Sequence, residues 1–184
     1  FAPAHIAAQH GHIEALRFLV EKGAGYNQKI SKDPPVVNKN SDYNLAIMEG
    51  DVETLRLGYE RNFFDVNATD EFGSTRTSLA AKYGHVEVVR FLVENGGDIN
   101  YKGIDGLTPA KIAAKYGHTE TLRVLIDNDA DVTAKSDEGE STAYLAAKSG
   151  HVEALRVLID NGVDVNAINA KGSMPVHAAA RNGR

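Results

Sequence analysis

The sequence predicts an all-α solenoid of short helix pairs, and three observations lead to that prediction. A glycine, followed by histidine in four of the six copies, recurs at intervals of 39, 34, 33, 33 and 33 residues, at Gly11, Gly50, Gly84, Gly117, Gly150 and Gly183. Alanine pairs precede most copies, and amphipathic apolar stripes follow them. A period of this length is typical of stacked helical repeats, because one helix pair cannot bury its apolar face alone.

The first helix of each unit is expected to be short and lined with small side chains. In the copy around residue 110, Thr108 is the predicted N-cap and Pro109 the first helical residue, where a missing N–H group carries no cost. Ala110 and Ala113 suit close helix packing. Gly117 is expected to end the helix in the left-handed conformation, which glycine adopts readily.

The second helix is expected to start near His118, with Glu120 close to the positive end of the helix dipole. Helical spacing places its apolar residues on one face, which is predicted to be buried. In three copies this face comprises Val86, Val89, Leu92 and Val93; Leu122, Leu125 and Ile126; and Val152, Leu155, Leu158 and Ile159.

The second unit is irregular in two ways. Gly58 stands where the other second helices carry a leucine, and we expect Phe63 and Phe64 to fill the space. Extra residues before this unit predict an extended finger insertion at 30–40, where Asp33, Pro34 and Pro35 oppose regular structure. The insertion is either a contact loop for a partner or a surface turn that tolerates added length.

The period, the alanine pairs, the Gly-His steps and the Asp-x-Asn turns together resemble the ankyrin repeat family, whose first helices start with Thr-Pro-Leu-His. Thr108 and Pro109 keep half of that signature, and Lys111 replaces its histidine. The resemblance implies one domain over 1–184 with β-turn or hairpin fingers and about five and a half repeats. The repeats are expected at about 1–29, 41–69, 70–102, 103–135, 136–168 and, in part, 169–184.

Composition and motifs argue against several function classes. The chain has no cysteine, which excludes disulfides and thiolate chemistry, and its net charge of -5 disfavours nucleic-acid binding. No apolar run reaches the roughly 18 residues that cross a bilayer, so no membrane contact is expected. Phosphate-binding loops, nucleophile elbows and paired catalytic carboxylates are absent from the sequence, so we predict neither an enzyme nor a cofactor. A cytoplasmic monomer is expected, cut from a longer protein because the sequence lacks an initiator methionine and stops within a unit.

Three further patterns have simpler explanations than a site. Four histidines occupy the Gly-His slot of separate units, so we expect hydrogen bonds near helix starts and no zinc. The carboxylates from Asp127 to Glu138 imitate a calcium loop, but Val132 stands where that loop needs glycine. Asn67 matches the glycosylation pattern only because the Asp-x-Asn turn generates it.

Members of the resembled family generally bind proteins through the finger tips and the concave face of the first helices. The resemblance therefore implies another protein as partner, with no small-molecule substrate, and these contact residues: Phe72, Lys82, Tyr83, Ile104, Asp105, Leu107, Lys115, Tyr116, Asp137, Glu138, Lys148 and Arg181. The row of cations suits an acidic or mixed-charge polypeptide, or it is simply a solvated helix face. A scaffold or adaptor is the expected function. The alternative is the targeting or regulatory arm of a larger multidomain enzyme or a secreted microbial effector, which would act in the host cytosol.

Overall fold

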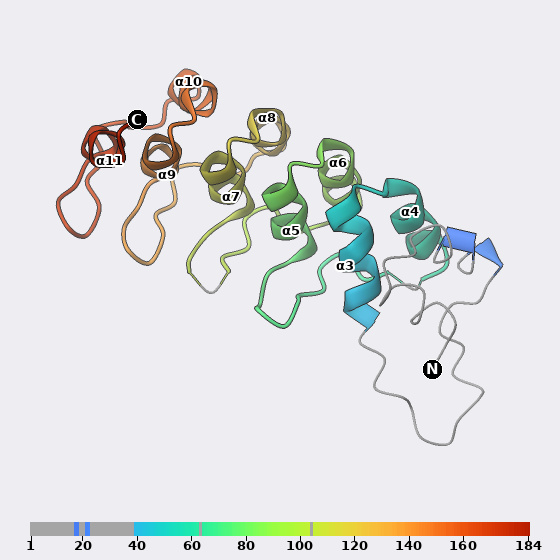
Figure 1. Ribbon diagram of the computed structural model, residues 1–184. Helices are drawn as coiled ribbons and strands as arrows, with labels where there is room; N and C mark the ends of the chain where they lie inside the picture. Colours follow the sequence, from blue (N-terminus) through green and yellow to red (C-terminus); the bar gives the residue numbers. More distant parts are fainter. Residues whose placement is uncertain (1–16, 19–20, 23–38, 63, 104) are drawn as a thin grey trace.

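The computed structural model describes residues 17–18, 21–22, 39–62, 64–103 and 105–184 of the chain. Over these residues two layers of helices lie side by side, and each unit contributes one helix to each layer (Figure 1). The first layer holds α3 (Lys39–Glu49), α5 (Arg76–Tyr83), α7 (Pro109–Tyr116), α9 (Thr142–Ser149) and α11 (Pro175–Arg181), and the second holds α4 (Val52–Glu60), α6 (Val86–Glu94), α8 (Thr119–Asp127) and α10 (Val152–Asp160). Helices contact their neighbours within each layer, as the predicted all-α solenoid requires.

Several predictions concern parts of the chain outside the described residues. The first predicted repeat (1–29) is described only at residues 17–18 and 21–22, and the insertion at 30–40 only at its last two residues, which begin α3. The proposed repeat boundaries therefore stay predictions. Among the described helices, none has the length and apolar character needed to cross a lipid bilayer.

The predicted Thr108 cap of α7 is present, and α5 and α9, where the signature is worn, are capped in the same way. Thr75, Thr108 and Ser141 each accept a hydrogen bond from the backbone N–H three residues later, at 3.2, 3.4 and 3.1 Å. Gly117 ends α7 with a φ of 77°, in the left-handed region. The helix starts and ends are therefore set by local hydrogen bonds and one glycine conformation.

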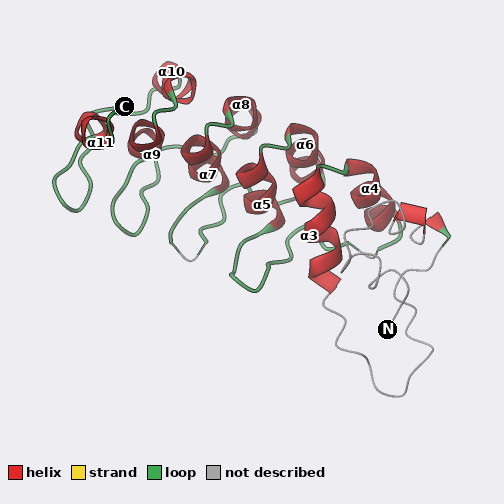
Figure 2. Cartoon of the chain, viewed as in Figure 1, coloured by secondary structure: helices red, strands yellow, loops and turns green. Residues whose placement is uncertain are grey.

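Fingers join the units and project from the first layer on one side (Figure 2). Each finger is closed by a backbone bond across five residues, from Asp70 to Ser74 (2.9 Å), from Ser136 to Glu140 (3.0 Å) and in the two equivalent fingers. A single bridge pairs Thr69 with Thr75, and the described residues form no longer strand. The hairpin-like fingers match the prediction.

The predicted buried stripe of the second helices is right in α8 and partly wrong in α10. Leu122 and Leu125 are fully buried, whereas Val152 and Ile159 are 57% and 52% exposed. At equivalent positions of α6 and α8, the apolar side chains are partly buried against the core, namely those of Val86, Val93 and Ile126. A further helix of the layer contacts α6 and α8, whereas none follows α10 among the described residues. Burial of this face thus depends on the neighbouring unit as much as on helical spacing.

The space beside Gly58 is filled differently from the prediction. A Cβ atom at Gly58 would lie 2.6 Å from the ring of Tyr43, so the glycine makes room for a fully buried tyrosine on α3. Phe64 is also buried, with its ring centroid 5.0 Å from that of Tyr43, whereas Phe63 lies outside the described residues. The contact between Tyr43 and Gly58 could not be predicted from the sequence, because helical spacing indicates only which residues of the same helix are neighbours.

Candidate functional site

Cationic side chains form a row across the first layer of helices. Lys82, Lys115, Lys148 and Arg181 occupy equivalent positions near the C-terminal ends of α5, α7, α9 and α11, and all four are exposed. Adjacent first helices pack against one another, and packed helix axes lie about 8–10 Å apart. The predicted row therefore exists on one surface, with each cation one helix away from the next.

Two of the cations are followed by exposed tyrosines. Tyr83 is 38% and Tyr116 is 44% exposed, although both are large aromatic side chains. Each ring stacks on a histidine two residues later, His85 or His118, with centroids 6.4 Å apart and planes within 8° and 16° of parallel. Each tyrosine ring thus lies nearly parallel to a histidine ring on a surface that water can reach.

These histidines also join neighbouring units. The Nε2 atom of His85 lies 2.8 Å from the carbonyl oxygen of Met48, and that of His118 lies 3.0 Å from the carbonyl oxygen of Lys82. A side chain at Gly84, which has a φ of 76°, would collide with the His118 ring. Both histidines are hydrogen-bonded as predicted, but neither side chain caps the start of its own helix: each bond runs to a carbonyl of the previous unit.

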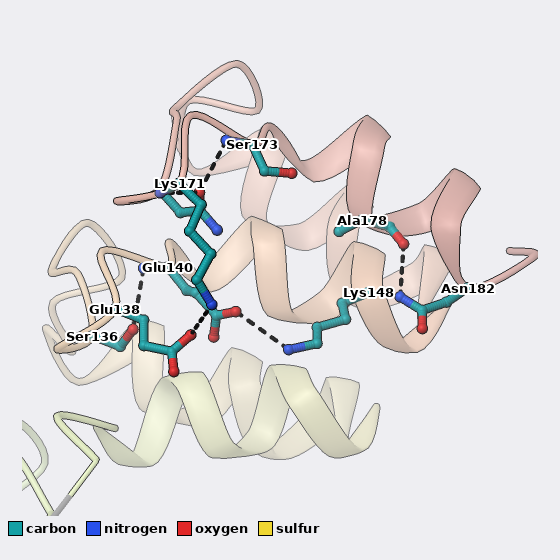
Figure 3. A network of polar contacts seen from close by, with 9 residues as sticks. Ser136, Glu138, Glu140, Lys148, Lys171, Ser173, Ala178 and Asn182 are labelled. Atoms are coloured by element: carbon teal, nitrogen blue, oxygen red, sulfur yellow. Dashed lines mark hydrogen bonds and ion pairs between the residues drawn. The ribbon is translucent and has the colours of Figure 1, made fainter.

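Lys148 differs from the other members of the row. Its Nζ atom lies 3.3 Å from Oε1 of Glu140, a nearly buried carboxylate at the base of the same unit's finger (Figure 3). A second pair joins the adjacent fingers, with Lys171 Nζ 3.7 Å from Glu138 Oε2. The sequence prediction treated Lys148 and Glu138 as available contacts, but both are already paired with other charges.

Lys82 and Lys115, unlike Lys148, make no ion pair among the described residues, so their charges are available to a bound molecule. Each Nζ atom lies 5.8 Å from the ring centroid of the tyrosine that follows it, Tyr83 or Tyr116. Over the part of the chain that the structure describes, no carboxylate pairs with either lysine. Two neighbouring helices therefore present the same exposed lysine and tyrosine pair.

The finger tips lie apart from this row. Phe72 is 67% exposed, and Asp105, Asp137 and Glu138 are exposed as predicted. Leu107 is only partly exposed, because it stands at the base of its finger directly before the buried Thr108. Ile104 lies outside the described residues.

Two buried cations were not predicted as features of the structure. Lys111 on α7 is fully buried, and no hydrogen bond to its Nζ atom occurs among the described residues. Burial lowers the pKa of Lys111, the nearby Lys102 lowers it further, and Asp131 opposes the change. The sequence held one signal, because Lys111 stands where the family signature has histidine.

Arg76 is the second buried cation. Its guanidinium carbon lies 3.9 Å from the ring centroid of Phe64 and 5.4 Å from that of Tyr43. Burial lowers its pKa to about 10, and the charge of Asp65 works in the opposite direction. Arg76 therefore packs two units together and is not available to a partner.

Other polar clusters serve the turns between units. Asp131 accepts hydrogen bonds from Thr133 and from the backbone of Ala134, and the Thr133 bonds lower its pKa most. Asn67 donates to the carbonyl of Gly96 and accepts from the backbone of Asp98. No group of three or more metal-ligating side chains forms within the described ranges. The calcium-like and glycosylation-like patterns thus have structural explanations.

Comparison with protein families gives matches along most of the chain. A model described as ankyrin repeats (3 copies) matches residues 43–136, one described as ankyrin repeats (many copies) matches 143–184, and one described as ankyrin repeat matches 1–30. The first alone covers the units that carry Tyr83 and Tyr116.

Several curated proteins with similar segments are much longer than this chain, which covers about a tenth or less of their length. Alpha-latrocrustotoxin-Lt1a of Latrodectus tredecimguttatus is 30% identical over 55% of the chain and 7% of its own length. Palmitoyltransferase akr1 of Schizosaccharomyces pombe is 38% identical over 33% of the chain and 10% of its length. The transient receptor potential cation channel subfamily A member 1 homolog of Caenorhabditis elegans is 30% identical over 52% of the chain and 7% of its length. The similarity thus concerns a small part of each relative.

Proposed function

The chain belongs to the ankyrin repeat family, and from this premise we propose that it is an adaptor or scaffold that binds a polypeptide across α5 and α7 and the adjacent finger tips. Ankyrin repeats are generally protein-interaction modules. Repeat domains of this kind are typically non-catalytic, and we propose no reaction for these repeats.

Exposed and ordered tyrosines carry the proposal. Tyrosine is enriched in protein interfaces because its ring buries a large area while its hydroxyl group stays hydrogen-bonded. Tyr83 and Tyr116 already have their rings stacked on His85 and His118, so binding would cost little side-chain entropy. Phe72 extends the apolar area toward the finger tips.

The test compares two double variants in the same two repeats. Tyr83→Ala/Tyr116→Ala removes the proposed contacts. Arg90→Ala/Arg123→Ala removes two exposed side chains of α6 and α8, whose ion pairs within the described residues are with Glu87 and Glu120. The parent chain and both variants are immobilised and incubated with lysate, and the retained proteins are identified by mass spectrometry. The affinity of each purified partner for the parent and the variants is then measured by calorimetry.

The proposal expects a partner that the parent and the arginine variant retain and that the folded tyrosine variant loses. Truncation of an interface anchor typically costs about 2 kcal/mol or more, which weakens binding roughly thirtyfold. Equal retention by the folded tyrosine variant would refute the assignment of this surface.

A second candidate function is the targeting or regulatory arm of a larger enzyme or secreted effector. It is supported by the relatives, which include a toxin and a palmitoyltransferase several times longer than the matched segment. The full reading frame is the first observation to make. If the full reading frame encodes a catalytic domain, binding of the separate repeats to that domain would support this candidate. A reading frame without a catalytic domain would remove it.

A further inference from the structure

We infer that the lysine and tyrosine surface of α5 and α7 selects an extended peptide with two acidic side chains three residues apart. This inference rests on the proposed function and specifies the chemistry of its partner. It uses the two positions where the sequence Lys-Tyr-Gly-His is complete, at Lys82 and Lys115.

On α5 and α7 the row presents two neighbouring cations that have no ion-pair partner among the described residues, and the adjacent position on either side lacks such a cation. On the α3 side the equivalent positions are Met48 and Glu49, which are exposed and bring no positive charge. On the α9 side the charge of Lys148 is paired with Glu140. Two carboxylates, and not a longer acidic run, therefore match the charge that this surface presents.

The distance between α5 and α7 sets how far apart the two carboxylates of the peptide must be. Lys82 and Lys115 occupy the same position on packed neighbouring helices, whose axes are about 8–10 Å apart. A peptide in the polyproline II conformation, which is extended and has three residues per turn, advances about 3.1 Å per residue, so side chains three residues apart lie on the same face about 9 Å from one another. Acidic residues at that interval reach both ammonium groups when the peptide crosses the helices at a right angle.

The acidic finger tips do not cancel this preference. Seven residues of helix separate Thr108 at the finger base from Lys115, a distance of about 10 Å at 1.5 Å per residue. Asp105 and Asp137 lie in the fingers that precede α7 and α9, and over the described residues neither forms an ion pair with Lys82 or Lys115. Tyr83 and Tyr116 lie beside the lysines and would cover the apolar parts of the peptide between its acidic residues.

The experiment titrates fluorescein-labelled nine-residue peptides with two glutamates in a Ser/Thr background, at separations of one to five residues. Fluorescence anisotropy is followed in 50 mM salt with the parent chain. The expected result is tightest binding at a separation of three. Lys82→Gln/Lys115→Gln should weaken that peptide about tenfold, near threefold per lysine, and Arg90→Gln/Arg123→Gln, with the same change in net charge, should not weaken it.

Three results would overturn the inference: equal affinity at every separation, equal weakening by both double variants, or no binding at millimolar peptide. Tighter binding of a single-stranded oligonucleotide with a steep salt dependence would also overturn it in favour of a nucleic acid. If a cellular protein is still captured through Tyr83 and Tyr116 while these peptides fail, the proposed function stands and only its peptide chemistry is wrong.

Discussion

Replacing the buried Lys111 with methionine is expected to stabilise the protein. The Lys111 side chain is fully buried on α7, and no hydrogen bond to its Nζ atom occurs among the described residues. A buried donor without a partner costs about 1–3 kcal/mol, and more when it is charged. Methionine fills a similar volume without a polar atom, so Lys111→Met should raise the free energy of unfolding by about 1–3 kcal/mol.

Histidine at the same position tests the cause more directly. In α11, His177 Nδ1 accepts the backbone N–H of Met174 at 3.2 Å, and an ammonium at Lys111 cannot accept the equivalent bond from Thr108. Lys111→His is therefore expected to be stabilising as well, because it removes the buried charge and supplies the missing acceptor.

The effect of pH has a definite sign. Burial lowers the pKa of Lys111 in the folded state, so the unfolded chain binds more protons as pH rises through that pKa. The stability of the parent should therefore rise toward alkaline pH relative to Lys111→Met. The advantage of the variant should be largest at neutral pH and smaller at pH values above the folded pKa.

Urea unfolding followed by circular dichroism at neutral and alkaline pH measures both effects. Lys115→Met is the matched control, since Lys115 lies one turn later on the same helix and is exposed. Its effect should stay within about 0.5 kcal/mol. A loss of stability in Lys111→Met, or an advantage independent of pH, would show that the ammonium has a compensating partner and that the reasoning is wrong.

Two glycine substitutions give further predictions, both measured by urea unfolding. Gly58→Ala should destabilise by about 1–2 kcal/mol although alanine favours helices by about 1 kcal/mol, because its Cβ would overlap the Tyr43 ring; a gain in stability would contradict this packing. Gly84→Ala should cost at least about 1 kcal/mol more than Gly96→Ala. Both glycines have positive φ, but only Gly84 faces a neighbouring side chain, that of His118, so equal costs would count against the collision.

The fold was predictable because its determinants are local and repeated. Thr108, Pro109 and Gly117 set where a helix begins and ends through bonds within a few residues. The period then specifies that identical neighbours stack. The same reasoning failed for Val152 and Ile159, since their exposure depends on the absence of a following helix over α10 in the described chain.

The sequence predicted where the side chains of the candidate site lie, but not which of their charges are already paired within the protein. Helix position alone placed Lys82, Lys115 and Lys148 on one surface. Pairing of Lys148 with Glu140 depends on how a finger base folds against the end of α9, which no helical spacing reveals. The support of Tyr83 by His85 could have been noticed, because the two side chains recur at a fixed separation of two residues in consecutive units.

The bonds between units explain why this surface suits recognition. His118 Nε2 is held at the carbonyl of Lys82, so the residue that presents one cation is fixed by the repeat that presents the next. On the other side of the units, Asn100 accepts from the backbone of Asp131 in the following turn. The lysine and tyrosine pairs of α5 and α7 are therefore parts of one hydrogen-bonded array. Because the backbone positions of these pairs are set before binding, we expect a partner, as inferred above, to be selected by the spacing of its own charges, with little backbone ordering cost.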